Sequence, residues 1–252
     1  MKTKPYIGIT GVTCREQVEA IVEMADRIGL PRTHQLMIGV LASYRSLVWG
    51  ELADPHQYVQ VEVLNGVFVN DRRLFNLVHY NSRADGLVRQ LVDLVSRVDC
   101  ADGVQLNIPW PAVSSLRRHR ERAYTPVVLQ ISHRAYCEVG GTPERLVERL
   151  RGYAGVIEYV LFDPSGGLGK DFDGKQAESI LAALVEAELP FRYGVAGGLA
   201  PGKLQRLKPL LEIYSELSWD AQGGLRNQAR QLDLGRCRRF LEESYDLIVS
   251  LS

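Results

Sequence analysis

Two glycine pairs, Gly197-Gly198 and Gly223-Gly224, each follow a short apolar run in the C-terminal half of this 252-residue chain. Glycine lets a backbone approach a ligand closely and leaves N–H groups that can point at an anion. A single pair is most simply a tight turn, but two pairs in corresponding places favour a shared phosphate site. This hypothesis requires a fold that brings the two runs together.

A carboxylate ends another apolar run, because Asp163 follows the sequence YVLF and precedes PSGGLGK. At the end of a buried strand a carboxyl group is partly desolvated, which raises its pKa and suits a general acid. The alternative is a carboxylate that caps the N–H groups of its own loop. The three glycines and Lys170 that follow predict a mobile lid.

Further polar side chains lie near the predicted ends of strands, namely His79, Asn81, Gln130, His133 and Asp220. Histidine titrates near neutrality, so His133 opposite Asp163 would complete an acid and base pair. The alternative for either histidine is a hydrogen-bonded residue of the rim.

Arg45 follows the second predicted strand by a few residues. From there a guanidinium can reach inward and hold a carboxylate with two hydrogen bonds, or it can face solvent at the start of a helix. No His, Asp or Glu residues have the spacing that places two metal ligands on one element. We therefore expect no metal and no cofactor.

These residues must be positioned by regular elements. Short apolar runs alternate with longer amphipathic stretches along the chain, a pattern that is typical of βα units around a parallel sheet. Strands are predicted at residues 6–10, 36–42, 75–80, 103–108, 126–131, 159–163, 193–196 and 217–221. Helices are predicted at 15–28, from 87 onward, and at 144–153, 174–188, 201–211 and 235–247.

Eight strands in this length favour a closed (β/α)8 barrel, a TIM barrel, over an open doubly wound sheet. No linker interrupts the pattern, so we expect one domain over residues 1–252. Residues 46–74 are the exception, because they combine partial alternation with an Asn-Asp turn. We expect an extra hairpin there that replaces or accompanies the second helix.

Composition limits the partners. Lys plus Arg equals Asp plus Glu at 30 each, so charge gives no reason to expect nucleic acid or an anionic membrane. We expect a small phosphorylated substrate and a monomer or homodimer. No apolar run is long enough to span a membrane. The four cysteines show no C-x-x-C spacing and follow no secretory segment, which predicts reduced thiols in the cytoplasm.

Several segments resemble phosphoribosylanthranilate isomerase, a barrel enzyme of tryptophan biosynthesis that performs an Amadori rearrangement. The strongest match is LFDPSGGLGKDFD, which is similar to the family's strand-six aspartate and glycine-rich lid. AGGLAPGKL resembles the family's phosphate loop, and DAQGGLR resembles its strand-eight segment. VQLN, which holds Gln105 and Asn107, is similar to its strand-four motif, and SYR resembles the motif whose arginine faces the substrate carboxylate.

The resemblance implies a divergent member, with Asp163 as general acid and an aldose–ketose isomerisation of a phosphorylated sugar. Thr10 stands where the family has its general base, a cysteine. An aliphatic hydroxyl cannot abstract a carbon-bound proton unaided, so we expect His133 as a substitute base. Asn107 replaces a histidine and Gly223 a serine. The alternatives are a phosphate-binding barrel with a different reaction and a non-catalytic phosphometabolite-binding paralogue.

Overall fold

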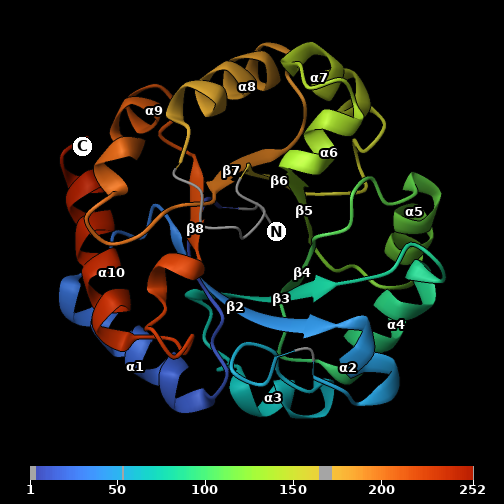
Figure 1. Cartoon of the computed structure of the whole chain (residues 1–252), viewed down its shortest axis with the longest axis horizontal. Coiled ribbons are helices and arrows are strands. Elements are labelled where there is room, and N and C mark those ends of the chain that lie inside the picture. Colours follow the sequence, from blue (N-terminus) through green and yellow to red (C-terminus); the bar gives the residue numbers. More distant parts are fainter. Residues whose placement is uncertain (1–3, 53, 165–171, 252) are drawn as a thin grey trace.

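The eight predicted strands all form, and they pair in sequence order to close a parallel barrel (Figure 1). The computed structural model describes residues 4–52, 54–164 and 172–251. The strands are β1 (Tyr6–Thr10), β2 (Gln35–Ser43), β3 (Leu74–Asn81), β4 (Gly103–Leu106), β5 (Val127–Ser132), β6 (Tyr159–Asp163), β7 (Arg192–Ala196) and β8 (Ser218–Ala221). The prediction of a closed (β/α)8 barrel is confirmed.

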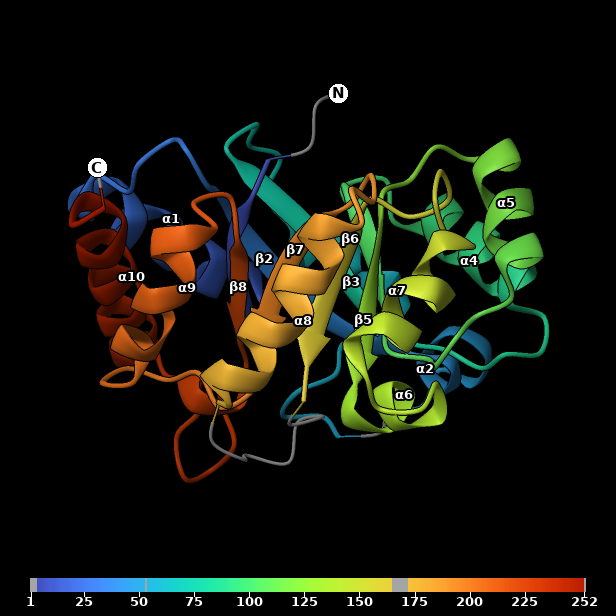
Figure 2. The same ribbon diagram turned by 90° about the horizontal axis from the view of Figure 1, so that it is seen from above.

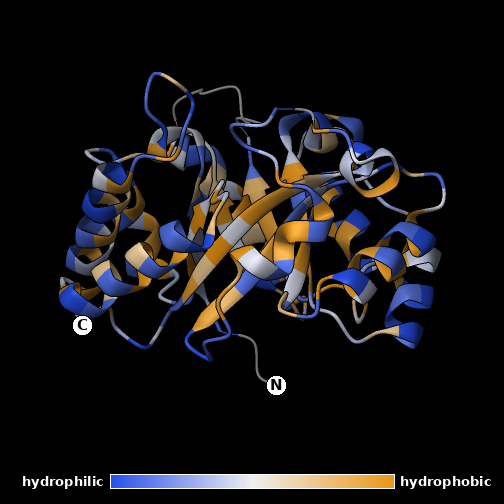
Figure 3. Ribbon diagram, turned by 90° about the horizontal axis from the view of Figure 1, so that it is seen from below, coloured by the Kyte–Doolittle hydropathy of each residue, from blue (hydrophilic) through white to orange (hydrophobic). Residues whose placement is uncertain are grey.

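Helices surround the barrel and turn polar faces outward, whereas the strands are largely apolar (Figure 3). The α-helices are α1 (Arg15–Ile28), α2 (Tyr44–Trp49), α3 (Leu64–Val67), α4 (Leu87–Arg97), α5 (Val113–Arg122), α6 (His133–Glu138), α7 (Pro143–Arg151), α8 (Gly174–Glu186), α9 (Lys208–Ile213) and α10 (Leu234–Val249). The short 3-10 helices are η1 (Val61–Val63), η2 (Leu204–Leu207) and η3 (Gly223–Leu225).

Glycine and proline explain where two helices end or divide. Helix α1 covers the predicted range. Gly29 ends it by taking a left-handed conformation with φ 73°, in which its N–H donates to the backbone oxygens of Ala25 and Asp26. The single helix predicted over 201–211 is instead η2 followed by α9. Pro209 has no N–H to donate to the preceding turn, so the helix starts anew around it.

The barrel interior is apolar at one end and polar at the other. At the N-terminal ends of their strands, Tyr6, Phe75 and Tyr159 pack ring to ring, with centroids 5.5–5.8 Å apart. Because alternate side chains of a strand face the same side, the residues four positions further along also point inward. The C-terminal end of the barrel therefore holds polar side chains. Figure 2 shows that end opposite the N-terminus, with the loop after β8.

The predicted hairpin in residues 46–74 is wrong. The described residues of this segment form α2, η1 and α3, and their link to a strand is an isolated parallel bridge between Leu41 and Tyr58. The buried residues Val61, Leu64 and Val67 recur at helical spacing. The apparent alternation was therefore part of a helical face.

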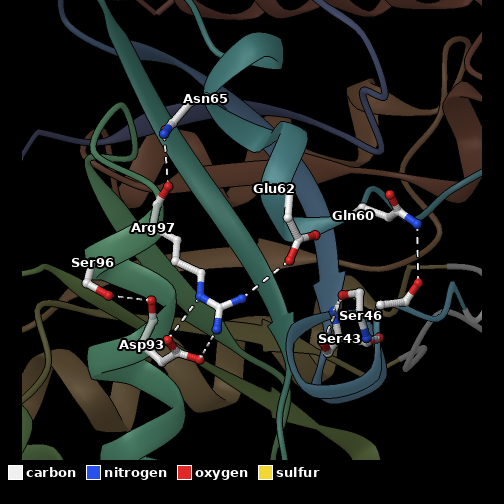
Figure 4. A network of polar contacts seen from close by, with 9 residues as sticks. Ser43, Ser46, Gln60, Glu62, Asn65, Asp93, Ser96 and Arg97 are labelled. Carbon is white, nitrogen blue, oxygen red and sulfur yellow. Dashed lines mark hydrogen bonds and ion pairs between the residues drawn. The ribbon is translucent and has the colours of Figure 1, made fainter.

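Polar contacts tie this segment to its surroundings (Figure 4). Asn65 donates a hydrogen bond to the backbone oxygen of Arg97 at 2.9 Å, and the Arg97 guanidinium lies 3.3 Å from Glu62. The side chains of Ser43 and Ser46 cap each other's backbone at the start of α2. The contacts of Asn65 and Glu62 with Arg97 hold η1 and α3 against α4.

None of the four cysteines forms a disulfide in the structure. In the part of the chain that the structure describes, no helix is both long and apolar enough to cross a membrane. The segment predicted as a lid, residues 165–171, lies outside the described residues.

Candidate functional site

Six polar side chains meet at the C-terminal end of the barrel interior, each from a different strand. Five are buried, and Gln130 is half-buried. They are Thr10 of β1, His79 of β3, Gln105 of β4, Gln130 of β5, Asp163 of β6 and Asp220 of β8. We call these six residues the polar mouth.

The first half of the polar mouth is a chain from His79 through Thr10 to Asp220. The Thr10 hydroxyl donates to Asp220 Oδ1 at 2.8 Å, and Thr10 Oγ1 lies 3.5 Å from His79 Nε2. A hydroxyl has one hydrogen, and here Asp220 accepts it. When Asp220 is ionised, the proton between Thr10 and His79 therefore lies on His79 Nε2.

Burial shifts the pKa of both ends of this chain. Burial raises the pKa of Asp220 to about 7; the nearby Asp163 adds to this rise, and the Thr10 hydrogen bond opposes it. Burial lowers the pKa of His79 to about 3. At neutral pH, His79 is therefore neutral and Asp220 exists in both protonation states.

The second half of the polar mouth is a chain of two amides that ends on Asp163. Gln130 Nε2 donates to Asp163 Oδ2 at 2.7 Å, and Gln105 Nε2 lies 3.3 Å from Gln130 Oε1. These two hydrogen bonds fix the orientation of the side-chain amides of Gln105 and Gln130. They leave the buried Gln105 Oε1 without a hydrogen bond within the described residues. Such an oxygen can accept a hydrogen bond from a substrate hydroxyl or amine.

Gly39 of β2 makes room for the hydrogen-bonded side chains of Thr10 and His79, a role that was not predicted from the sequence. A Cβ at this position would lie 2.4 Å from Thr10 Oγ1 and 2.8 Å from His79 Nε2. Any side chain here would push both polar groups away. A glycine inside an apolar strand was the available signal, since it often marks a close approach.

We expect Gly39→Ala to destabilise the fold by about 1–3 kcal/mol, because the methyl group overpacks the polar mouth. Urea denaturation would measure this change. Gly66→Ala is the matched control, because a Cβ at Gly66 in α3 meets no atom within 4 Å. An equal effect of both variants would contradict the role assigned to Gly39.

The structure brings the two glycine turns together beside the polar mouth. A Cβ at Gly224 would lie 2.2 Å from the Leu199 backbone oxygen, so the turn after β8 packs on the turn after β7. Gly197 and Gly198 have φ of 88° and 70°, which favour glycine. Within the described residues, the N–H groups of Gly197, Gly198 and Gly223 donate to no other group.

The two glycines after β8 differ in their surroundings. Gly224 is in tight contact, whereas a Cβ at Gly223 would meet open space. We therefore expect Gly223→Ala to keep the stability but weaken the binding of inorganic phosphate at least about tenfold. We expect Gly224→Ala to cost about 1–3 kcal/mol of stability, since the backbone of Leu199 cannot move aside. Calorimetric titration and urea denaturation measure the two effects, and unchanged phosphate affinity in Gly223→Ala would contradict the site.

Three residues predicted for the site do not join the polar mouth. Arg45 lies in α2, is exposed and pairs with Glu51 at 2.6 Å. His133 begins α6 and is exposed, with Nε2 3.5 Å from Cys137 Sγ one turn further along the helix. Asn107 is exposed after β4. The two helix-start residues turn outward because the helix begins directly after the strand, so their side chains follow the helix surface.

No group of three or more His, Cys, Asp or Glu side chains in the described residues is arranged to hold a metal ion.

The residues of the polar mouth are suited to proton transfer, because the polar mouth contains two carboxyl groups, Asp163 and Asp220. One of them has a pKa near neutrality, where a group can both accept and donate protons.

Comparisons with known proteins support the fold. No protein-family model matches the sequence, and no curated protein matches it. N-(5'-phosphoribosyl)anthranilate isomerase from Pyrococcus furiosus is similar in structure, with a TM-score of 0.63, 13% identity, and 96% of this chain and 99% of that chain covered.

Two barrels with other descriptions are also similar. A beta-mannanase from Streptomyces thermolilacinus has a TM-score of 0.53, 12% identity, and 94% of this chain and 85% of that chain covered. A Rubisco-like protein from Rhodopseudomonas palustris has a TM-score of 0.52, 14% identity, and coverage of 98% and 65%. At these identities the likenesses show the TIM-barrel fold alone, because one fold carries many functions.

Proposed function

We propose that this chain is an isomerase of the aldose–ketose (Amadori) type that acts on a phosphorylated sugar derivative, with Asp163 and Asp220 as its proton-transferring groups. The observation that carries the proposal is the pair of carboxyl groups on β6 and β8 at the polar mouth. Asp163 raises the pKa of Asp220. Two neighbouring carboxyl groups resist full ionisation, so the pair retains a proton near neutrality. The pair shares one proton, and the reactive form is the one in which Asp163 holds that proton and Asp220 is ionised.

The reaction follows from this division. Asp163 donates a proton to the ring oxygen of the sugar, the ring C–O bond breaks, and an iminium forms on the amine side. Asp220 then takes the proton from the neighbouring carbon, and the electron pair of that C–H bond moves to give an enolamine. Asp220 then returns its proton to the former iminium carbon while the enol hydroxyl gives its proton to Asp163, which forms the aminoketone and restores both carboxyl groups.

The remaining polar residues position these groups. Thr10 holds Asp220 by the 2.8 Å hydrogen bond, so its hydroxyl orients the base and does not replace it. Gln130 holds Asp163 in the same way. The N–H groups of the glycine turns would bind the phosphate, and Gln105 Oε1 would accept a substrate hydrogen bond. His133 has no part in this proposal, because it is exposed on α6.

A non-catalytic phosphometabolite-binding protein is the second candidate, favoured by the presence of Thr10 at the position of the family's cysteine. Two measurements separate the candidates. The first is turnover of phosphoribosylanthranilate by the purified protein, with complementation of a strain that lacks the isomerase. The second is thermal stabilisation by inorganic phosphate. If phosphate stabilises the protein but neither this substrate nor a related aminosugar phosphate is turned over, only the binding-protein hypothesis remains.

The variant Thr10→Cys tests whether the rest of the site is intact. A thiol ionises much closer to neutrality than a hydroxyl, so we expect isomerase turnover to rise in this variant. Thr10→Ser is the control, because it keeps the hydroxyl. Equal turnover in both variants would show that a base at this position does not limit the reaction.

A further inference from the structure

A cavity of about 570 Å³ opens at the end of the barrel opposite the polar mouth. Its lining includes Lys4, which precedes β1, Leu36 at the start of β2 and Leu74 at the start of β3. The last turns of α1 and the loop after it complete the wall. This volume lies within the range of small-molecule sites, and no residue of the cavity belongs to the polar mouth or the glycine turns.

The floor of the cavity is apolar. Ala25, Leu36 and Leu74 are almost fully buried beneath it, and Val22 and Leu30 are half-buried. Burying apolar surface contributes about 25 cal/mol per Å², so a ring or hydrocarbon chain would gain free energy by covering this floor.

The rim of the cavity is positively charged. Lys4, Arg32 and Arg72 are exposed there, and within residues 4–52, 54–164 and 172–251 none of the three forms a salt bridge with a carboxylate. Asp26, the acidic residue of the lining, is bound by Arg73, which also pairs with Asp71. The positive rim stands out because the whole chain has a formal net charge of zero.

We propose that this cavity is a second binding site, for a small anionic ligand with an apolar body. A phosphate, sulfonate or carboxylate group would lie against Lys4, Arg32 and Arg72, and the apolar body would lie on Val22, Leu36 and Leu74. Cations that converge on a concave surface raise the local concentration of anions. The concave shape, with its enclosed apolar floor, fits a small molecule. The proposal does not depend on the reaction at the polar mouth.

The fluorescent probe anilinonaphthalene sulfonate combines a sulfonate with aromatic rings and tests the site directly. We expect saturable binding of one probe per chain. The double variant Arg32→Gln/Arg72→Gln should weaken it about tenfold or more, as expected for loss of two charge contacts. The matched control is Arg117→Gln/Arg118→Gln, which removes two exposed arginines from α5. It should leave probe affinity unchanged, and circular dichroism should show that every variant is folded.

A second variant separates the floor from the rim. Val22→Trp should fill the cavity and abolish probe binding, and Val22→Gln serves the same purpose if the tryptophan variant does not fold. Gly223→Ala, at the other end of the barrel, should leave probe affinity unchanged. Three results would overturn the proposal: binding that does not saturate, equal loss in both arginine pairs, or full probe affinity in both Val22 variants.

Discussion

Asp220→Asn is expected to stabilise the folded protein above pH 7 and to have almost no effect on stability near pH 4. The folded pKa of Asp220 is about 7, against an ordinary value of 3.8. Between these values the folded state holds a proton that the unfolded state has lost, so this group's contribution to stability falls as pH rises through the window. Above pH 7 the cost is on the order of 4 kcal/mol. Asparagine resembles the protonated carboxyl group and avoids this cost.

His79 changes the free energy of unfolding with pH in the opposite direction. Its folded pKa is about 3 against an ordinary 6.5, so its contribution to stability falls as pH drops from 6.5 towards 3. In the natural protein the two slopes oppose each other between about pH 4 and 6.5. Asp220→Asn removes one of them, so we expect the variant to lose stability on acidification over this range.

Urea denaturation between pH 4 and pH 8 measures both effects. Besides burial, the groups that shift the pKa of Asp220 are Thr10 and Asp163, and Asp220 in turn raises the pKa of Tyr6. Asp246→Asn, on the exposed face of α10, is the control and should follow the natural protein. If the stability difference between Asp220→Asn and the natural protein were the same at pH 5 and pH 8, Asp220 would not hold its proton in the folded state.

Asp163→Asn is expected to lower the turnover number by about 10²- to 10⁴-fold with a small change in KM, because it removes the proton donor and keeps a hydrogen-bond acceptor for Gln130. The variant also removes the charge that raises the pKa of Asp220. The alkaline limb of the pH–rate profile, where the pair loses its shared proton near pH 7, should therefore be absent from the variant.

The loss of the alkaline limb separates a catalytic role of Asp163 from a structural one. A variant that only distorted the site would lose turnover but keep the alkaline limb. Gln130→Glu is a useful companion, because it replaces the donor on Asp163 with a second carboxyl group of similar size. Unchanged turnover in Asp163→Asn, with phosphate binding retained, would remove Asp163 from the mechanism.

The amino-acid sequence by itself determined the barrel and the location of its glycine turns. Eight short apolar runs, each followed by turn residues or a helix, allow few arrangements other than a parallel barrel. The ends of α1 and β6 were predictable because local signals decide them: Gly29 stops the helix, and Asp163 ends the apolar run. Residues 46–74 misled the prediction, since a short helical face and a strand share the same partial alternation.

The tertiary structure alone decided which polar groups meet. Thr10 lies 69 residues from His79 and 210 residues from Asp220 in sequence. Barrel closure joins β1 to β8, and it buries Asp220 deeply enough to raise its pKa to about 7. His133 follows β5 as closely as Asp163 ends β6, yet one turn of helix directs it to the surface. Side-chain direction and desolvation depend on neighbours that are distant in sequence, so no local pattern could have shown that Asp220 is the better candidate for the base.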